Sequence, residues 1–151
     1  LETGGGVEKI LPWFDNQAFL LVAADIWTEF SFKSLINVNT EVVDAYAVIA
    51  PKPVWLANGD FAIDANNNLT VDTKSNFTFA GLSVLHPRLW SSKIGGTYPL
   101  SKVLTKAAHE KKLRGLVLND AWFNIGCKQR LEELCKYLRI DINHTNYITK
   151  A

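Results

Sequence analysis

The stretch FLLVAADIW, residues 19–27, is a run of apolar side chains that ends in a single carboxylate, Asp25. Its first six residues have the length of one strand, and no polar residue interrupts them. A strand without polar positions is typical of a parallel sheet that helices cover on both faces. We therefore expect residues 19–24 to form a fully buried strand, with Asp25 at its carboxyl end.

Around this stretch, the hydrophobic pattern alternates between helices and strands. Apolar residues at positions 7, 10, 11 and 14 have the spacing of one helical face, which predicts a short helix. Residues 32–36 favour a second short helix, and residues 45–50 form another apolar run of strand length. This order is that of a βαβ unit, so we expect an α/β fold.

The second half of the chain continues the same alternation. Asparagines between two short β-prone runs predict a hairpin over residues 60–72, because asparagine tolerates left-handed backbone conformations. The remaining expected elements are a strand at 77–86, a helix start at 86–90, a loop at 91–99, a helix at 100–113, a strand at 115–120, a tight turn at 121–127 and a helix at 128–138. Residues 141–151 have weak periodicity and are expected to be loosely attached.

Composition indicates a single globular domain over residues 1–151. The chain is 48% hydrophobic and 21% charged. Its net charge of +1 gives no indication of the basic surface that nucleic-acid binding requires. No apolar run is long enough for a membrane span, and two cysteines are too few for a disulfide framework. We therefore expect a cytoplasmic protein whose partners are small molecules or protein. Because the chain starts at Leu1 and has no methionine, we expect it to be part of a longer protein.

Three segments contain candidate binding or catalytic residues. In open α/β sheets, ligands bind beyond the carboxyl ends of the strands, where Asp25 is expected. The alternative is that Asp25 caps the following turn or helix, and the spacing favours neither interpretation. Glycines 4–6 precede a helix, and such a turn can present backbone N–H groups to a nucleotide or can simply be flexible. In WFNIG, residues 122–126, Asn124 is either a binding residue or an ordinary turn former.

Taken together, the motifs resemble those of the sugar-phosphate nucleotidyltransferases. The matching segments, in chain order, are LETGGGVEKILP, FLLVAADIWTEFSF, GDF, FTFAGLSVLHPRLW, YPLSKVL and WFNIGCKQRLEEL. The resemblance implies a Rossmann-like, mainly parallel mixed sheet with flanking helices. It also implies an enzyme that joins a sugar 1-phosphate to a nucleoside triphosphate and releases pyrophosphate. Within the family, the motifs are most similar to those of uridylyltransferases that use N-acetylmuramic acid 1-phosphate and UTP in peptidoglycan recycling.

The resemblance also implies roles for particular residues. Asp25 matches the acid that holds Mg²⁺, and Asn124 matches the position of the second metal ligand, which is usually an aspartate. Asp60 and Gly81 match positions on the sugar side of the site. The segment that contacts the nucleotide base corresponds here to Glu2, Thr3, Gly4 and Gly5.

The chain departs from the family pattern in ways that leave alternatives open. The glycine-rich GxGxRLxPLT loop, which cradles the triphosphate in the first βαβ unit, does not occur, so this segment alone is expected to be inactive. Within the matched region, the atypical residues are Ala23, Ala24, Asn124 and Cys127. One alternative is a nucleotidyltransferase for mannose or glucose 1-phosphate that uses GTP or dTTP. The other is a catalytically silent relative that binds a nucleotide or a nucleotide-sugar.

Overall fold

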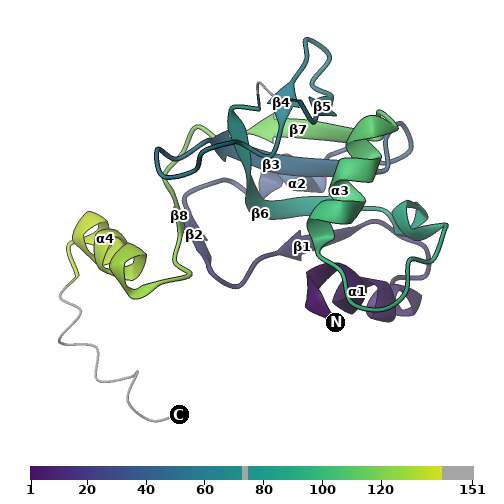
Figure 1. The fold of residues 1–151 in the computed structure, drawn as a ribbon, viewed down its shortest axis with the longest axis horizontal. Helices are drawn as coiled ribbons and strands as arrows, with labels where there is room; N and C mark the ends of the chain where they lie inside the picture. The colour runs from purple at the N-terminus through teal and green to yellow at the C-terminus, as the bar shows by residue number, and fades with distance from the viewer. Residues whose placement is uncertain (73–74, 141–151) are drawn as a thin grey trace.

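Four strands form the central sheet of the computed structural model, which describes residues 1–72 and 75–140. Their order in the sheet is β1 (Phe19–Val22), β6 (Phe77–Leu85), β3 (Ala45–Pro51) and β7 (Leu113–Val117). β3 and β7 pair in parallel, whereas β6 is antiparallel to both β1 and β3. Strands β1, β3 and β7 therefore run in one direction (Figure 1), which confirms the expected α/β fold with a mixed, mainly parallel sheet.

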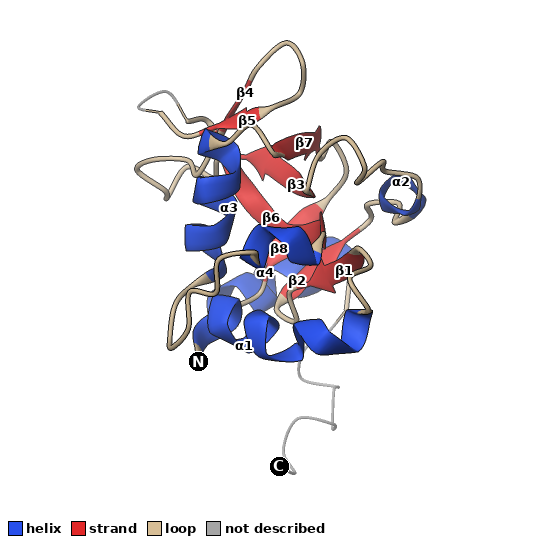
Figure 2. Ribbon diagram, turned by 90° about the vertical axis from the view of Figure 1, so that its right-hand side faces the viewer, coloured by secondary structure: helices blue, strands red, loops and turns tan. Residues whose placement is uncertain are grey.

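Helices cover both faces of this sheet, as expected. On one face, α1 (Glu2–Ile10) and α3 (Leu100–His109) pack together and enclose a core that contains Ile49, Leu104 and Leu113. On the other face, the segment around α2 (Lys33–Ile36) encloses a second core with Val48 and Leu82. Figure 2 shows the sheet between these helices. The remaining helical elements are η1 (Leu11–Phe14), η2 (Pro87–Trp90) and α4 (Lys128–Leu138). None of the helices in the described ranges combines the length and apolar character of a membrane span.

The prediction for residues 19–24 is right about a strand and wrong about its surroundings. β1 lies at the edge of the sheet and pairs only with β6 in the described part of the chain. Its side chains alternate in burial, so that Phe19 is buried while Leu20 is 48% and Val22 is 43% exposed. An uninterrupted apolar run indicates a strand, but it does not show how many of its faces are covered.

The expected turn at residues 121–127 contains a strand. β8 (Trp122–Asn124) pairs antiparallel with β2 (Ile26–Thr28), and this two-stranded ribbon leads from the main sheet to α4 (Figure 1). The hairpin predicted over residues 60–72 is confirmed as β4 (Ala62–Ile63) and β5 (Leu69–Thr70). The segment 141–151, expected to be loosely attached, lies outside the described residues.

The three glycines near the amino end belong to a helix and not to a turn. Gly4 and Gly5 are buried in α1, and the N–H groups of both donate to the carbonyl oxygen of Tyr98, at 3.0 and 3.2 Å. A Cβ atom on Gly4 would lie 2.5 Å from the Tyr98 ring. Glycine is therefore needed here because α1 packs closely against the loop before α3, and not because it presents N–H groups to a ligand.

The Glu8 side chain joins α1 to the loop before α3 through hydrogen bonds. Its carboxylate accepts hydrogen bonds from the Tyr98 hydroxyl (2.6 Å) and from the backbone N–H groups of Gly95 (3.0 Å) and Ile94 (3.1 Å). The Tyr98 hydrogen bond is the main cause that lowers the pKa of Glu8. Burial, followed by the hydrogen bond to Glu8, raises the pKa of Tyr98 to about 12.

We expect Glu8→Gln to lower the free energy of unfolding by about 1 kcal/mol at pH 7, because a partly exposed, charge-assisted hydrogen-bond network is weakened. Since folding lowers the pKa of Glu8, its contribution is present above its ordinary value of 4.5 and is lost as pH falls through the folded pKa. The free energies of unfolding measured in urea should therefore differ at pH 7, and the difference should shrink as the pH falls below 4.5. Glu41→Gln, at an exposed carboxylate, is the control, and an equal effect there would contradict the assignment.

Candidate active site

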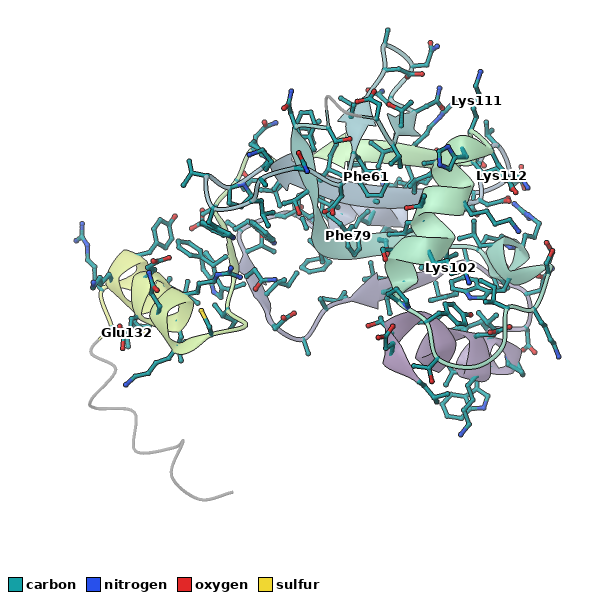
Figure 3. All side chains as sticks on the ribbon, viewed as in Figure 1. Phe61, Phe79, Lys102, Lys111, Lys112 and Glu132 are labelled. Carbon is teal, nitrogen blue, oxygen red and sulfur yellow. The ribbon has the colours of Figure 1, made fainter. Side chains whose placement is uncertain are left out.

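A cleft of about 330 Å³ opens beyond the carboxyl end of β1. One wall is the end of β1 with β6, where Phe79 lies on the sheet face that α3 covers (Figure 3). The opposite wall is the amino end of α3, with Pro99, Leu100 and Ser101, and the amino end of α1 adds Thr3. The ribbon of β2 and β8 closes one end with Ile26 and Asn124. The cleft thus occupies the place where α/β sheets bind ligands.

Asp25 and Asn124, which are 99 positions apart in the sequence, lie next to each other. Asn124 lines this end of the cleft, whereas Asp25 lies beside Asn124 and is not among the lining residues. β2 and β8 hold them there, because Ile26 is paired with Asn124 and the Ile125 N–H donates to the Asp25 carbonyl oxygen at 2.7 Å. A Cβ atom on Gly126 would lie 3.2 Å from Asn124 Oδ1 and 3.4 Å from Asp25 Oδ2. Both side-chain oxygens therefore border one small volume, and Asp25 is exposed to solvent.

Asp25 and Asn124 differ in whether their side-chain oxygens already accept hydrogen bonds. The Asp25 carboxylate accepts no hydrogen bond from the described residues, so it is open to a cation. Asn124 Oδ1 accepts hydrogen bonds from the Gly126 N–H at 3.2 Å and from an Arg130 NH group at 3.0 Å. Because an amide oxygen has two lone pairs, both of its acceptor positions are in use.

The side-chain oxygens of Asp25 and Asn124 are of the type that binds Mg²⁺ in proteins. Mg²⁺ is usually bound by one or two protein oxygens, with substrate phosphates and water completing its coordination. Asp25 offers a free carboxylate for such a site, and Asn124 offers an oxygen once one of its present donors moves away. Within residues 1–72 and 75–140, no cluster of three or more histidine, cysteine, aspartate or glutamate side chains offers a competing metal site.

Gly81 lines the cleft in a conformation that favours glycine. Its φ angle is +82°, and a Cβ atom would lie 2.9 Å from Cβ of Ala23 and 3.1 Å from Cγ2 of Ile26. Its carbonyl oxygen accepts a hydrogen bond from the Ala23 N–H at 2.8 Å. The small residue Ala23, which is atypical for the resembled family, therefore packs directly against the backbone of Gly81. The sugar-side role predicted for Gly81 stays a prediction.

Asp60 lies outside the cleft and forms hydrogen bonds with the start of β6, which contributes to the cleft wall. Its Oδ2 accepts hydrogen bonds from the Phe79 N–H at 2.8 Å and from the Thr78 hydroxyl at 2.7 Å. Asp60 is not among the residues that line the cleft, but Phe79 is. In this arrangement Asp60 fixes the start of β6, and its predicted contact with sugar hydroxyl groups stays a prediction.

The residues predicted to contact the nucleotide base have different positions. Thr3 lines the cleft, and Glu2 precedes it at the exposed start of α1. Gly4 and Gly5 are buried beneath Tyr98 and Gly96, so their N–H groups are already used. The predicted base contact is not tested by these positions, but the structure leaves Thr3 as the member of this group that faces the cleft.

Sequence reasoning missed the contributions of α3 and α4 to the site. Pro99 and Ser101 at the start of α3 line the cleft, and Pro99 directly before a helical pattern was the available signal for a helix start there. Arg130 of α4 reaches Asn124, although an arginine on an amphipathic helix has no sequence pattern that separates it from a solvated one.

Comparisons with known proteins relate this chain to sugar-phosphate nucleotidyltransferases. No protein-family model matches it. Over 139 residues, however, the chain is 26% identical to the N-acetylmuramate alpha-1-phosphate uridylyltransferase of Neisseria meningitidis. The resemblance found in the motifs is confirmed. The aligned region covers 88% of this chain but 60% of the relative, so the chain spans about three fifths of that protein's length.

Solved structures support the fold. HddC from Yersinia pseudotuberculosis superposes with a TM-score of 0.71 at 14% sequence identity, over 91% of this chain and 63% of HddC. It has also been solved in complex with GMP-PN, with a TM-score of 0.70. A putative glucose-1-phosphate thymidylyltransferase from Bacillus anthracis, in complex with a sucrose, gives a TM-score of 0.75 at 11% identity, over 92% of this chain and 63% of that one. At these identities, the likeness establishes the fold alone.

Proposed function

We propose that this chain is part of a sugar-phosphate nucleotidyltransferase. The observation that carries the proposal is that Asp25 lies beside Asn124, which lines one end of a cleft beyond β1. The 26% identity to an N-acetylmuramate alpha-1-phosphate uridylyltransferase favours UTP and N-acetylmuramic acid 1-phosphate as substrates. We also propose that the reaction takes place in the cytoplasm.

In the proposed reaction, a phosphate oxygen of the sugar 1-phosphate attacks the α-phosphorus of the nucleoside triphosphate. A new P–O bond forms, the bond between the α- and β-phosphates breaks, and pyrophosphate leaves. No covalent bond to the protein is required, so the protein acts by positioning and by electrostatic stabilisation.

Asp25 would hold Mg²⁺, with Asn124 as a second oxygen ligand. When bound, the metal neutralises the negative charge of the phosphates. The amino end of α3 forms the opposite wall of the cleft, and the partial positive charge of a helix amino end favours phosphate there. Glycine is required at position 81 in the cleft lining, because a Cβ atom there would collide with Ala23.

A silent nucleotide-sugar-binding relative is the second candidate. The observation in its favour is that Asn124 stands where the resembled enzymes have a second acid and that its oxygen is engaged by Arg130. This arrangement lowers the negative charge available to a metal. The two candidates differ in turnover and not in binding.

The test is to measure pyrophosphate release by the protein, with any coding sequence upstream of Leu1 included. We expect release from UTP only when N-acetylmuramic acid 1-phosphate and Mg²⁺ are both present. A panel with mannose and glucose 1-phosphates, and with GTP and dTTP, identifies the base and the sugar. Binding of UDP-sugar by calorimetry without turnover of any pair would support the silent relative.

A further inference from the structure

Arg130 occupies an unusual position between the cleft and the neighbouring loop. One NH group of its guanidinium donates to Asn124 Oδ1 at 3.0 Å. The same guanidinium lies over the ring of Trp55, 4.7 Å from the ring centroid. α4 supplies the arginine and the loop after β3 supplies the tryptophan. Arg130 therefore reaches the cleft through Asn124, which lines it, while Trp55 lines a separate pocket.

Arg130 forms no salt bridge with a described residue, since the five salt bridges in the ranges 1–72 and 75–140 join other pairs. Its partners are a neutral amide and an aromatic ring, and Arg130 itself is partly buried. Arginine is well suited to bind phosphate because its planar guanidinium can donate two parallel hydrogen bonds.

Arg130 and a divalent cation compete for the same atom. Asn124 Oδ1 has two acceptor positions, and the Gly126 N–H fills the other one. A cation that approached this oxygen would also meet the positive charge of the guanidinium. The present arrangement therefore opposes metal binding at Asn124 for as long as Arg130 stays there.

We propose that Arg130 exchanges partners when a phosphate-bearing ligand enters the cleft. In the free protein it is held by Asn124 and Trp55, and in the complex it binds a phosphate oxygen. This movement frees Asn124 Oδ1 for the divalent cation, so that phosphate and metal bind cooperatively. The inference rests on the proposed function, since it takes the ligand to be a phosphate ester or pyrophosphate. Trp55, which is 56% exposed, provides a face along which the guanidinium can turn.

The test compares Arg130→Gln with the unchanged protein in two separate binding measurements. Calorimetry with inorganic pyrophosphate, without metal, should show affinity reduced about tenfold, as expected for the loss of one charge-assisted hydrogen bond. Titration with Mn²⁺ alone, followed by electron paramagnetic resonance, should show tighter binding, because the competing cation is gone. Pyrophosphate should strengthen Mn²⁺ binding less in the variant than in the unchanged protein.

Lys128→Gln is the matched control. It removes one positive charge from the same helix, at a side chain that is 86% exposed and pairs with Glu132. The affinities of Lys128→Gln for pyrophosphate and for Mn²⁺ should both equal those of the unchanged protein. Glu132, labelled in Figure 3, lies on α4 away from the central sheet.

Arg130→Gln is expected to weaken pyrophosphate binding and to strengthen Mn²⁺ binding, and these opposite effects distinguish the proposal from a purely structural role of Arg130. If Arg130→Gln weakens both ligands equally, or changes neither, the exchange of partners is wrong. If Arg130→Gln does not fold, Arg130→Lys keeps the charge without the planar fork, and its pyrophosphate affinity should be lower than that of the unchanged protein. An equal affinity in that case would contradict the proposal. The predicted binding pattern without any nucleotidyl transfer would overturn the proposed function and leave the role of Arg130 standing.

Discussion

Asp25→Asn is expected to reduce the rate of nucleotidyl transfer by about 100- to 1,000-fold, a loss comparable to that of a preorganised electrostatic contact in a transition state. Asp25 is the carboxylate beside Asn124 at the end of the cleft, and the residues that line the cleft itself include no aspartate or glutamate. Asparagine keeps the shape of the side chain but not its charge. The initial rate of pyrophosphate release, measured over a range of Mg²⁺ concentrations, gives the effect.

The same substitution should leave the stability of the protein nearly unchanged. The Asp25 carboxylate is exposed and accepts no hydrogen bond from the described residues, so folding does not depend on it. Thermal unfolding of the variant checks this. Asp120→Asn, at another exposed carboxylate that lies outside the cleft, is the control and should keep full activity. Activity of Asp25→Asn within tenfold of the unchanged protein would remove Asp25 from the metal site.

The sequence predicted most elements of the fold because long periodic segments carry a clear signal. The helix spacing of Leu100, Val103 and Leu104 is found in α3, whose apolar side faces the core. The run at 45–50 is the buried strand β3. β1 has the same apolar composition but lies at an edge, because strand order depends on pairing between distant segments, which composition does not specify.

At the candidate site, the structure agrees with one expected proximity and contains features that were not expected. The proximity of Asp25 and Asn124 was expected from the family resemblance, and the structure shows it. The ribbon that produces this proximity was not expected, because β2 and β8 have three residues each and are too short for a periodic pattern. Arg130 was missed because its significance depends on which side chains from other elements surround it.

Glycines 4–6 show why a motif can be noticed correctly and explained wrongly. Their position was expected to indicate a turn before a helix, which either presents N–H groups to a nucleotide or is simply flexible. In the structure they are helical, and each has a different amount of space around it. A Cβ atom on Gly5 would collide with the backbone oxygen of Gly96, whereas one on Gly6 would have no neighbour within 4 Å.

This difference predicts opposite results for two identical substitutions. Gly6→Ala should raise the free energy of unfolding by about 0.5–1 kcal/mol, because alanine favours the helical backbone more than glycine does. Gly5→Ala should lower it by about 2–3 kcal/mol, because the colliding atom belongs to a backbone that has to move. That movement would also strain the hydrogen bonds from Gly4 and Gly5 to the Tyr98 carbonyl oxygen.

Urea denaturation of the two variants and the unchanged protein measures both effects, with the two substitutions serving as controls for each other. Because residues 96–99 lead directly into the cleft wall at Pro99, Gly5→Ala should in addition weaken ligand binding, while Gly6→Ala should not. If both substitutions stabilise the protein, α1 does not pack closely against this loop, and the close approach of the helix to Gly96 and Tyr98 is not what requires glycine at position 5.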